Sequence, residues 1–250
     1  MVKVAIADHS GGLGRVITEA IFATGKHQVF VLSRNPRRLF DDDIDIRSLE
    51  VDYSSTAQIA NVLRSNHIQV VVSAIGIVFE DSHLAQMNLI DAASQSGTVT
   101  RFAPSEYAID YVEAARNGFP FPVLGLAAYK SSHYKVEAFE KLKVTEMKHT
   151  RFIIGFLMDY YGFPAEPVPV LPLAVVLDME NCKAGIPGDG EGRITPTHSE
   201  TIGKSVAASL DLPTWPSRSW IVGGTLTWNE ALKIAEKARG TSPALYRGRN

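Results

Sequence analysis

Short apolar runs alternate with amphipathic, helix-like segments along the first 155 residues of the chain. The apolar runs are nearly continuous, which is typical of strands that are buried on both faces of a parallel sheet. The expected strands are residues 2–7, 28–33, 46–51, 70–74, 100–103 and 150–155. The expected helices are residues 13–24, 55–65, 82–95 and 129–142. With right-handed crossovers, this order predicts an α/β fold with a doubly wound parallel sheet.

The alternation of strands and helices breaks down after residue 155. Residues 163–172 are rich in proline, which central strands and helix interiors exclude. The later expected elements are strands 174–177 and 219–222, a glycine-rich turn at 188–192, and helices 199–210 and 228–238. We therefore expect a core, 1–155, and a second part, 156–250, that completes the sheet and adds a small substrate-side lobe. Residues 240–250 carry no fold signal, and the sequence stops abruptly there. We therefore expect that this lobe lacks part of its C-terminal end.

Composition and charge narrow the class of protein. The chain is 45% hydrophobic and 21% charged, and its formal net charge of −2 gives no electrostatic reason to bind nucleic acid or an anionic membrane. The single cysteine, Cys182, excludes an internal disulfide framework and suits a reducing compartment. The strand-like start leaves no room for a signal peptide, and no apolar run approaches the roughly 18 residues of a membrane span. We expect a soluble, cytoplasmic protein.

A glycine-rich turn follows the first expected strand. The residues at this strand-to-helix turn are Ser10, Gly11, Gly12, Leu13 and Gly14. Backbone amides at such a helix start can approach a diphosphate closely, and a glycine one turn into the helix lets that helix pack on the sheet. We therefore expect the first four of these residues to bind the diphosphate of a dinucleotide.

The alternative for this segment is a tight turn that binds nothing. Asp8 stands where a G-x-x-G-x-x-G pattern ending at Gly14 has its first glycine. Its carboxylate would repel phosphates if it pointed inward, and a non-glycine residue restricts the turn. A further hypothesis is therefore that Asp8 prevents this pocket from binding a nucleotide, and that the protein has no redox chemistry.

Polar residues end the second and third expected strands. Sites that prefer NAD usually place a carboxylate at the end of the second strand, but here Ser33 and Arg34 occupy this place. The guanidinium of Arg34 suits the 2′-phosphate of NADP(H), and a solvated basic helix start is the alternative. Asp52, which ends the third strand, is expected either to accept a hydrogen bond from the adenine amino group or to cap a turn.

Two further loops are expected at the carboxyl edge of the sheet, where ligands bind in open α/β folds. Ser73 and Ala74 are small residues at the point where a cofactor would cross this edge. Pro104, Ser105 and Glu106 follow the fifth strand, and we expect this loop to face a nicotinamide. Alternatively, Ser105 and Glu106 cap the next helix.

The helix expected over 129–142 carries candidate proton donors. Helical phase places His133 on the stripe of the apolar Val136 and Phe139, while Lys135 points further out. His133 is thus expected to face the sheet and to act as a general acid, with a buried structural histidine as the alternative. Lys130 is the second candidate, and solvation at the surface is its alternative.

The chain resembles the NmrA-like/isoflavone reductase-like family of atypical short-chain dehydrogenases, in particular its fungal members. The likeness covers nearly the whole chain and rests on the glycine turn, Ser33-Arg34 and the segments 102–107, 150–158, 186–190, 197–208 and 226–230. The resemblance implies an NAD(P)-binding Rossmann fold, with NADPH on the glycine turn and Arg34 and the nicotinamide near Pro104-Ser105-Glu106. Plant members use a catalytic lysine on the helix expected over 129–142, and its position corresponds to His133 here.

Two functions follow from this resemblance. The first is an NADPH-dependent oxidoreductase that acts on a small, aromatic or enone-like metabolite, with His133 or Lys130 assisting proton transfer and no metal. The alternative is an NAD(P)-sensing regulatory protein that binds the dinucleotide without turnover and has a protein partner.

Overall fold

A parallel sheet forms the centre of the molecule in this computed structural model, which describes residues 1–8, 12–35, 46–119, 126–162 and 173–247. The strands of this sheet are β1 (Lys3–Ala7), β2 (Gln28–Ser33), β3 (Arg47–Glu50), β4 (Val70–Ser73), β5 (Arg101–Ala103) and β6 (Lys148–His149). Their order is β3-β2-β1-β4-β5-β6, and all neighbouring pairs are parallel. The order reverses between β1 and β4, which confirms the predicted doubly wound sheet.

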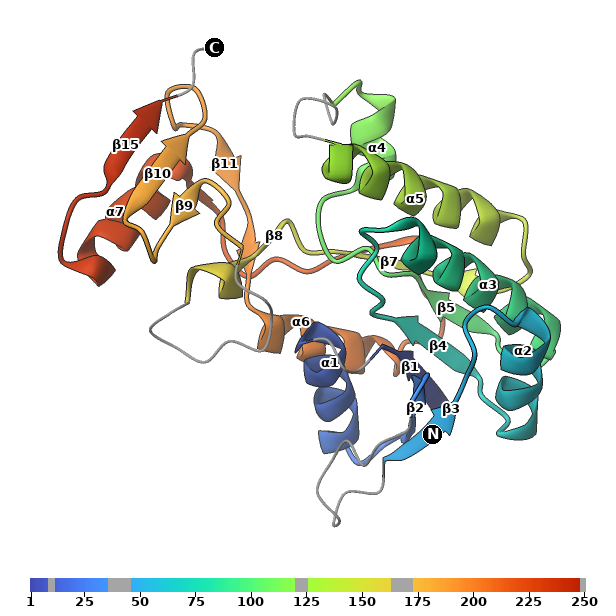
Figure 1. Ribbon diagram of the computed structural model, residues 1–250. Helices are drawn as coiled ribbons and strands as arrows, with labels where there is room; N and C mark the ends of the chain where they lie inside the picture. Colours follow the sequence, from blue (N-terminus) through green and yellow to red (C-terminus); the bar gives the residue numbers. More distant parts are fainter. Residues whose placement is uncertain (9–11, 36–45, 120–125, 163–172, 248–250) are drawn as a thin grey trace.

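Helices cover both faces of this sheet (Figure 1). On one side lie α1 (Gly12–Ala23) and α6 (Ser199–Ser209), and on the other lie α2 (Thr56–Ser65), α3 (Glu80–Ser96) and α5 (Leu126–Lys143). The strands supply both cores because successive side chains point to opposite faces. In β1, Val4 and Ile6 pack with α1 and α6, whereas Ala5 and Ala7 pack with α2, α3 and α5. Burial on both faces explains the continuous apolar runs of the sequence.

The second part of the chain pairs with β7 (Arg151–Ile153), which follows the last strand of the central sheet, in a separate two-stranded sheet. After β6 and Thr150, the chain continues as β7, which pairs in parallel with β13 (Arg218–Trp220). Next, β8 (Phe156–Leu157) pairs with β12 (Pro196–Thr197) and leads into the 3-10 helix η2 (Met158–Tyr161). The proline-rich segment 163–172 lies outside the described residues.

A small lobe with its own apolar core stands beside the sheet (Figure 1). It contains β9 (Leu177–Asp178), β10 (Lys183–Ile186) and β15 (Ala244–Arg247), in the order β15-β10-β9, together with α7 (Trp228–Arg239) and the pair β11 (Arg193–Ile194) and β14 (Leu226–Thr227). The expectation that 240–250 has no structure is wrong for Ala244–Arg247. This segment is a strand because it pairs with the distant β10, a contact that local sequence patterns do not reveal.

Candidate functional site

The described residues on either side of the expected glycine turn are Asp8, which follows β1, and Gly12, which begins α1. Asp8 adopts a left-handed conformation, with φ of 60°. Glycine reaches this region without strain, and aspartate is among the few other residues that tolerate it. The helix α1 then begins at Gly12, next to the half-buried Leu13, and carries no acidic residue in its first turn. Its N-terminal amides therefore keep a partial positive charge that favours an anion. Ser10 and Gly11 lie outside the described residues.

Arg34 lies beside this turn, at the carboxyl end of β2. Burial raises the pKa of Tyr53, the nearby Asp8 carboxylate raises it further, and Arg34 lowers it, so both charged groups lie near one tyrosine. The hydroxyl of Tyr53 donates to the Leu32 carbonyl at 3.2 Å. The side chain of Ser33 bonds to the main chain two residues further on, because its Oγ donates to the Asn35 carbonyl and accepts from the Asn35 amide. The structure thus brings Asp8 and Arg34 to one corner of the carboxyl edge.

Asp52 caps a turn, which is the second of its two predicted roles. Its Oδ1 accepts hydrogen bonds from the hydroxyl and the amide of Ser54, at 2.7 and 2.9 Å. These two bonds lower the pKa of Asp52. A contact with adenine stays a prediction.

The switch point between β1 and β4 contains an unsatisfied hydroxyl. Ser73 ends β4, is fully buried, and its Oγ has no hydrogen-bond partner among the described residues. The amide of Ala74 donates to the Ala7 carbonyl at 2.9 Å and so ties the two strand ends together. A buried polar group without a partner is costly, and a ligand that crosses the sheet here could satisfy it.

The loop after β5 is buried and tied to two helices. Ser105 and Glu106 are 6% and 1% exposed. The Ser105 amide donates to Oε1 of Gln86 on α3 at 3.2 Å. The Nζ of Lys135 on α5 donates to the main-chain carbonyls of Ser105 and Glu106, at 2.5 and 2.9 Å. The next helix, α4 (Tyr111–Arg116), is capped by Asp110 instead, so the capping role for Ser105 and Glu106 is wrong.

The buried face of α5 differs from the predicted one. His133 and Lys130 are exposed, whereas Lys135 is only 7% exposed. The expectation that His133 faces the sheet is therefore wrong. The buried positions of the described part of this helix recur once per turn, and they are Ser132, Lys135, the adjacent Ala138 and Phe139, and Leu142. The prediction missed this face because it placed the lysine on the polar side, although Lys135 stands three residues before Ala138 and seven before Leu142.

Glu106 and Lys135 form a buried acid–base pair at this edge. Burial raises the pKa of Glu106 to about 7, against the opposing effect of Lys135 and Arg151. Burial also lowers the pKa of Lys135, and the Glu106 carboxylate opposes this shift. Buried charged groups of this kind gather at catalytic sites, because burial brings their pKa values toward neutrality. The arrangement can donate or accept a proton beside a bound substrate.

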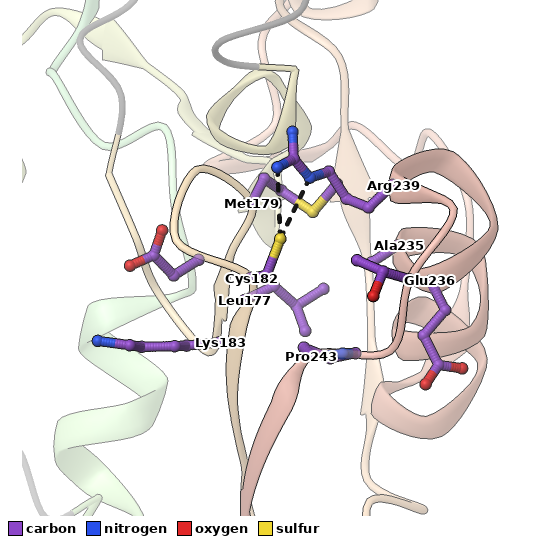
Figure 2. A pocket seen from close by; sticks show the side chains of 10 residues that line it. Leu177, Met179, Cys182, Lys183, Ala235, Glu236, Arg239 and Pro243 are labelled. Atoms are coloured by element: carbon purple, nitrogen blue, oxygen red, sulfur yellow. Dashed lines mark hydrogen bonds between the residues drawn. The ribbon is translucent and has the colours of Figure 1, made fainter.

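The pocket in the small lobe is too small to hold a dinucleotide or a substrate. Figure 2 shows a pocket in the lobe between β9, β10 and α7, where the guanidinium of Arg239 donates to the Cys182 sulfur at 3.3 and 3.4 Å. Its volume of about 10 Å³ is roughly the space that one water molecule needs. Within the described ranges, no three potential metal-ligating residues lie together, and no helix has the length and apolar character needed to cross a bilayer.

A family model and several known proteins are similar in sequence to this chain. A family model described as NAD(P)H-binding matches residues 10–160. Oxidoreductase BOA1 of Botryotinia fuckeliana is 33% identical over 240 residues, which cover 96% of this chain and 77% of the relative. Pinoresinol reductase 1 of Arabidopsis thaliana is 25% identical over 254 residues, covering 95% and 74%. The protein is therefore an NAD(P)H-binding oxidoreductase, and the chain belongs to the isoflavone reductase-like family.

Solved structures support the same fold. The structure of AtPrR2 with NADP+ and (+)pinoresinol superposes with a TM-score of 0.73 at 21% identity, over 100% of this chain and 79% of that chain. Leucoanthocyanidin reductase from Vitis vinifera gives a TM-score of 0.72 at 21% identity, over 99% and 77%. These matches confirm the predicted Rossmann-like architecture.

Proposed function

We propose that the protein is an NADPH-dependent reductase of a small, aromatic or enone-like metabolite, with Lys135 as the proton donor. The position of Lys135 is the observation that supports this most. Its ammonium is buried against the loop that follows β5, at the edge of the sheet where open α/β folds bind their ligands. Lys130 and His133, the predicted donors on the same helix, are exposed.

The residues at the carboxyl edge fit a bound dinucleotide. The N-terminal amides of α1 suit its diphosphate, and the unsatisfied Ser73 hydroxyl suits a group that crosses the switch point. Arg34 suits a 2′-phosphate, so we propose a preference for NADPH over NADH. Bound NADPH would supply a hydride to the substrate. Cofactor contacts by Ser33, Asp52, Ala74 and Pro104 remain predictions.

Lys135 completes the reduction by moving a proton. An ammonium carries three N–H groups, and the carbonyls of Ser105 and Glu106 accept two of them. The third is available to the substrate atom that gains negative charge when its neighbour accepts a hydride. Lys135 then takes a proton back from solvent, so that one hydride and one proton are added in each cycle.

The second part of the chain is proposed to border the substrate. We divide the molecule into a nucleotide-binding core, 1–155, and a part, 156–250, that pairs β13 with β7 and forms the lobe. Within the second part, the ring of Phe156 stacks on Tyr161 at 5.5 Å and meets Trp228 edge-on at 6.2 Å, which forms an aromatic cluster. The names of relatives that reduce pinoresinol suggest an aromatic substrate.

The test follows NADPH oxidation by the purified protein with a panel of small molecules. The panel contains pinoresinol, aromatic enones and aromatic ketones, and non-aromatic enones serve as controls. We expect NADPH to be consumed with an aromatic compound and a reduced product to form. Binding of NADPH without oxidation across the whole panel would instead favour the regulatory alternative.

A further inference from the structure

Glu106 has surroundings that an ordinary structural carboxylate would not have. The residue is 1% exposed, and neither carboxylate oxygen has a hydrogen-bond partner in the part of the chain that the structure describes. An ionised carboxylate in this position is costly unless an opposite charge lies close to it. The groups around Glu106 therefore decide its charge.

Two cations face Glu106, and one of them is already paired. Arg151 on β7 donates to Oδ1 of Asp110 at 2.5 Å, and Arg218 donates to Oδ2 of the same carboxylate at 3.3 Å. Lys135, in contrast, forms no ion pair within 4.0 Å among the described residues, and it donates hydrogen bonds to the uncharged main-chain carbonyls of Ser105 and Glu106. Glu106 is the negative charge that acts on the Lys135 ammonium.

The other polar groups near the pair do not supply this charge. The ring of Tyr111 on α4 lies 5.2 Å from the Lys135 Nζ, and burial raises the pKa of its phenol, so it stays neutral. Tyr160 on η2 lies near Tyr111, and burial raises its pKa as well. On the α3 side of the helix, His83 and Glu137 pair with each other at 3.0 Å.

We propose that Glu106 is a positioning residue that acts through Lys135: its buried carboxylate, when ionised, is the counter-charge that keeps the lysine ammonium protonated. Burial alone would favour a neutral amine, which has no acidic proton to give. Glu106 acts without a direct hydrogen bond to the ammonium, so the third N–H of Lys135 stays open to a substrate. The catalytic consequence rests on the proposed function, whereas the electrostatic coupling does not.

The coupling can be measured directly by NMR titration of the protein labelled with ¹³C at lysine Cε. The Lys135 signal is assigned by its loss in Lys135→Met. In Glu106→Gln, we expect the titration midpoint of Lys135 to fall by about one pH unit or more, as when an opposite charge a few ångströms away is removed. Glu140→Gln is the matched control, because it removes the same charge from an exposed position on α5 and should leave the midpoint unchanged. An unchanged midpoint in Glu106→Gln would overturn the proposal.

Two more variants keep the test decisive if Glu106→Gln does not fold. Glu106→Asp retains the charge, so the Lys135 midpoint should stay close to that of the wild type. A fall of about one unit in Glu106→Asp would mean that side-chain shape controls Lys135, against the proposal. In Lys135→Met, followed with ¹³C-labelled glutamate, the Glu106 midpoint should rise above its wild-type value, because coupling acts on both partners. No rise would contradict the coupling.

These titrations need neither cofactor nor substrate. A protein that never oxidises NADPH can therefore still show the coupling, while an uncoupled pair leaves the reductase proposal open to its own test. Where turnover is found, the high-pH limb of the rate profile should move to lower pH in Glu106→Gln and not in Glu140→Gln.

Discussion

Asp110 connects three structural elements through charge. Its side chain is only 6% exposed, caps α4, and forms ion pairs with Arg151 on β7 and Arg218 on β13. Burial on its own would raise the pKa of Asp110, but hydrogen bonds from the Glu113 amide and from both arginines outweigh it and lower the pKa. The folded protein thus holds the ionised form more strongly than the unfolded chain does, which stabilises the fold at neutral pH.

Asp110→Asn is expected to lower the free energy of unfolding at neutral pH by about 3 to 5 kcal/mol, because it removes the carboxylate that forms the ion pair with the buried Arg151. The Asp110 contribution is present above its ordinary pKa of 3.8 and is lost as pH falls through its lower folded value. Urea unfolding at several pH values should show that the difference from the wild type shrinks below about pH 4. The control, Glu113→Gln, removes an exposed partner of Arg218 and should cost less than about 1 kcal/mol. A difference that stays constant with pH would contradict this account.

The proposed contact of Arg34 with the 2′-phosphate predicts a preference for NADPH over NADH. Arg34→Ala should weaken NADPH binding about 10- to 100-fold and leave NADH binding unchanged, since a charge-assisted hydrogen bond contributes about 1.5 to 3 kcal/mol. Calorimetric titration of both cofactors measures this. Arg47→Ala is the control, because Arg47 starts β3 at the opposite, amino edge of the sheet. Equal loss of affinity for the two cofactors would remove the proposed role of Arg34.

For single residues, the sequence predicted which residues lie at the carboxyl edge of the sheet better than it predicted which side chains are buried. Arg34, Ser73 and Glu106 were expected at this edge because they follow strands, and strand ends meet at one edge of a parallel sheet. Lys135 was missed because a charged residue is usually exposed, and only the tertiary structure shows that the loop after β5 accepts its hydrogen bonds.

At the scale of elements, α6 packs closely on α1 and so couples the second part of the chain to the helix whose N-terminus is proposed to bind the nucleotide. Gly203 on α6 allows this approach, since a Cβ there would lie 3.0 Å from the Val16 carbonyl oxygen and 3.1 Å from the Ala20 Cβ. The two helices share a core with β1 and β4. Any separation of the helices therefore also moves the start of α1.

Gly203→Leu is expected to destabilise the fold by about 1 to 3 kcal/mol, the usual cost of overpacking. It should also weaken NADPH binding, because α1 carries the amides proposed to bind the diphosphate. Ala208→Leu on the exposed face of α6 is the control and should stay within about 0.5 kcal/mol of the wild type. Thermal unfolding and cofactor titration measure both effects. A stable Gly203→Leu variant would show that the two helices can separate freely.

Periodic elements were predicted well, and elements that depend on distant partners were not. The expected helix 55–65 corresponds to α2, which begins after the Ser55 cap with a hydrogen bond to the Gln58 amide. The short α4 and the strands β10 and β15 were not predicted. Each strand is four residues long and is held by pairing across the lobe, so local periodicity carries little signal.

At the scale of the whole molecule, residues that are far apart in the sequence lie together at the carboxyl edge of the central sheet. Asp8 and Arg34 lie at one corner, and Ser73 ends the neighbouring strand at the switch point. Lys135 reaches the loop after β5 from the helical layer on one side of the sheet. We propose that cofactor binding and proton transfer both take place at this single edge.

The rate of reduction by Lys135→Met, compared with that of His133→Ala, tests this account most directly. With any substrate that the wild type reduces, kcat/KM of Lys135→Met should fall about 100- to 10,000-fold, the usual contribution of a general acid. The affinity for NADPH should stay within about twofold, because the lysine is not proposed to bind the cofactor. His133→Ala should remain within about threefold of the wild-type rate, since its side chain is exposed. A Lys135→Met protein that keeps the wild-type rate, or a loss as large in His133→Ala, would contradict the account.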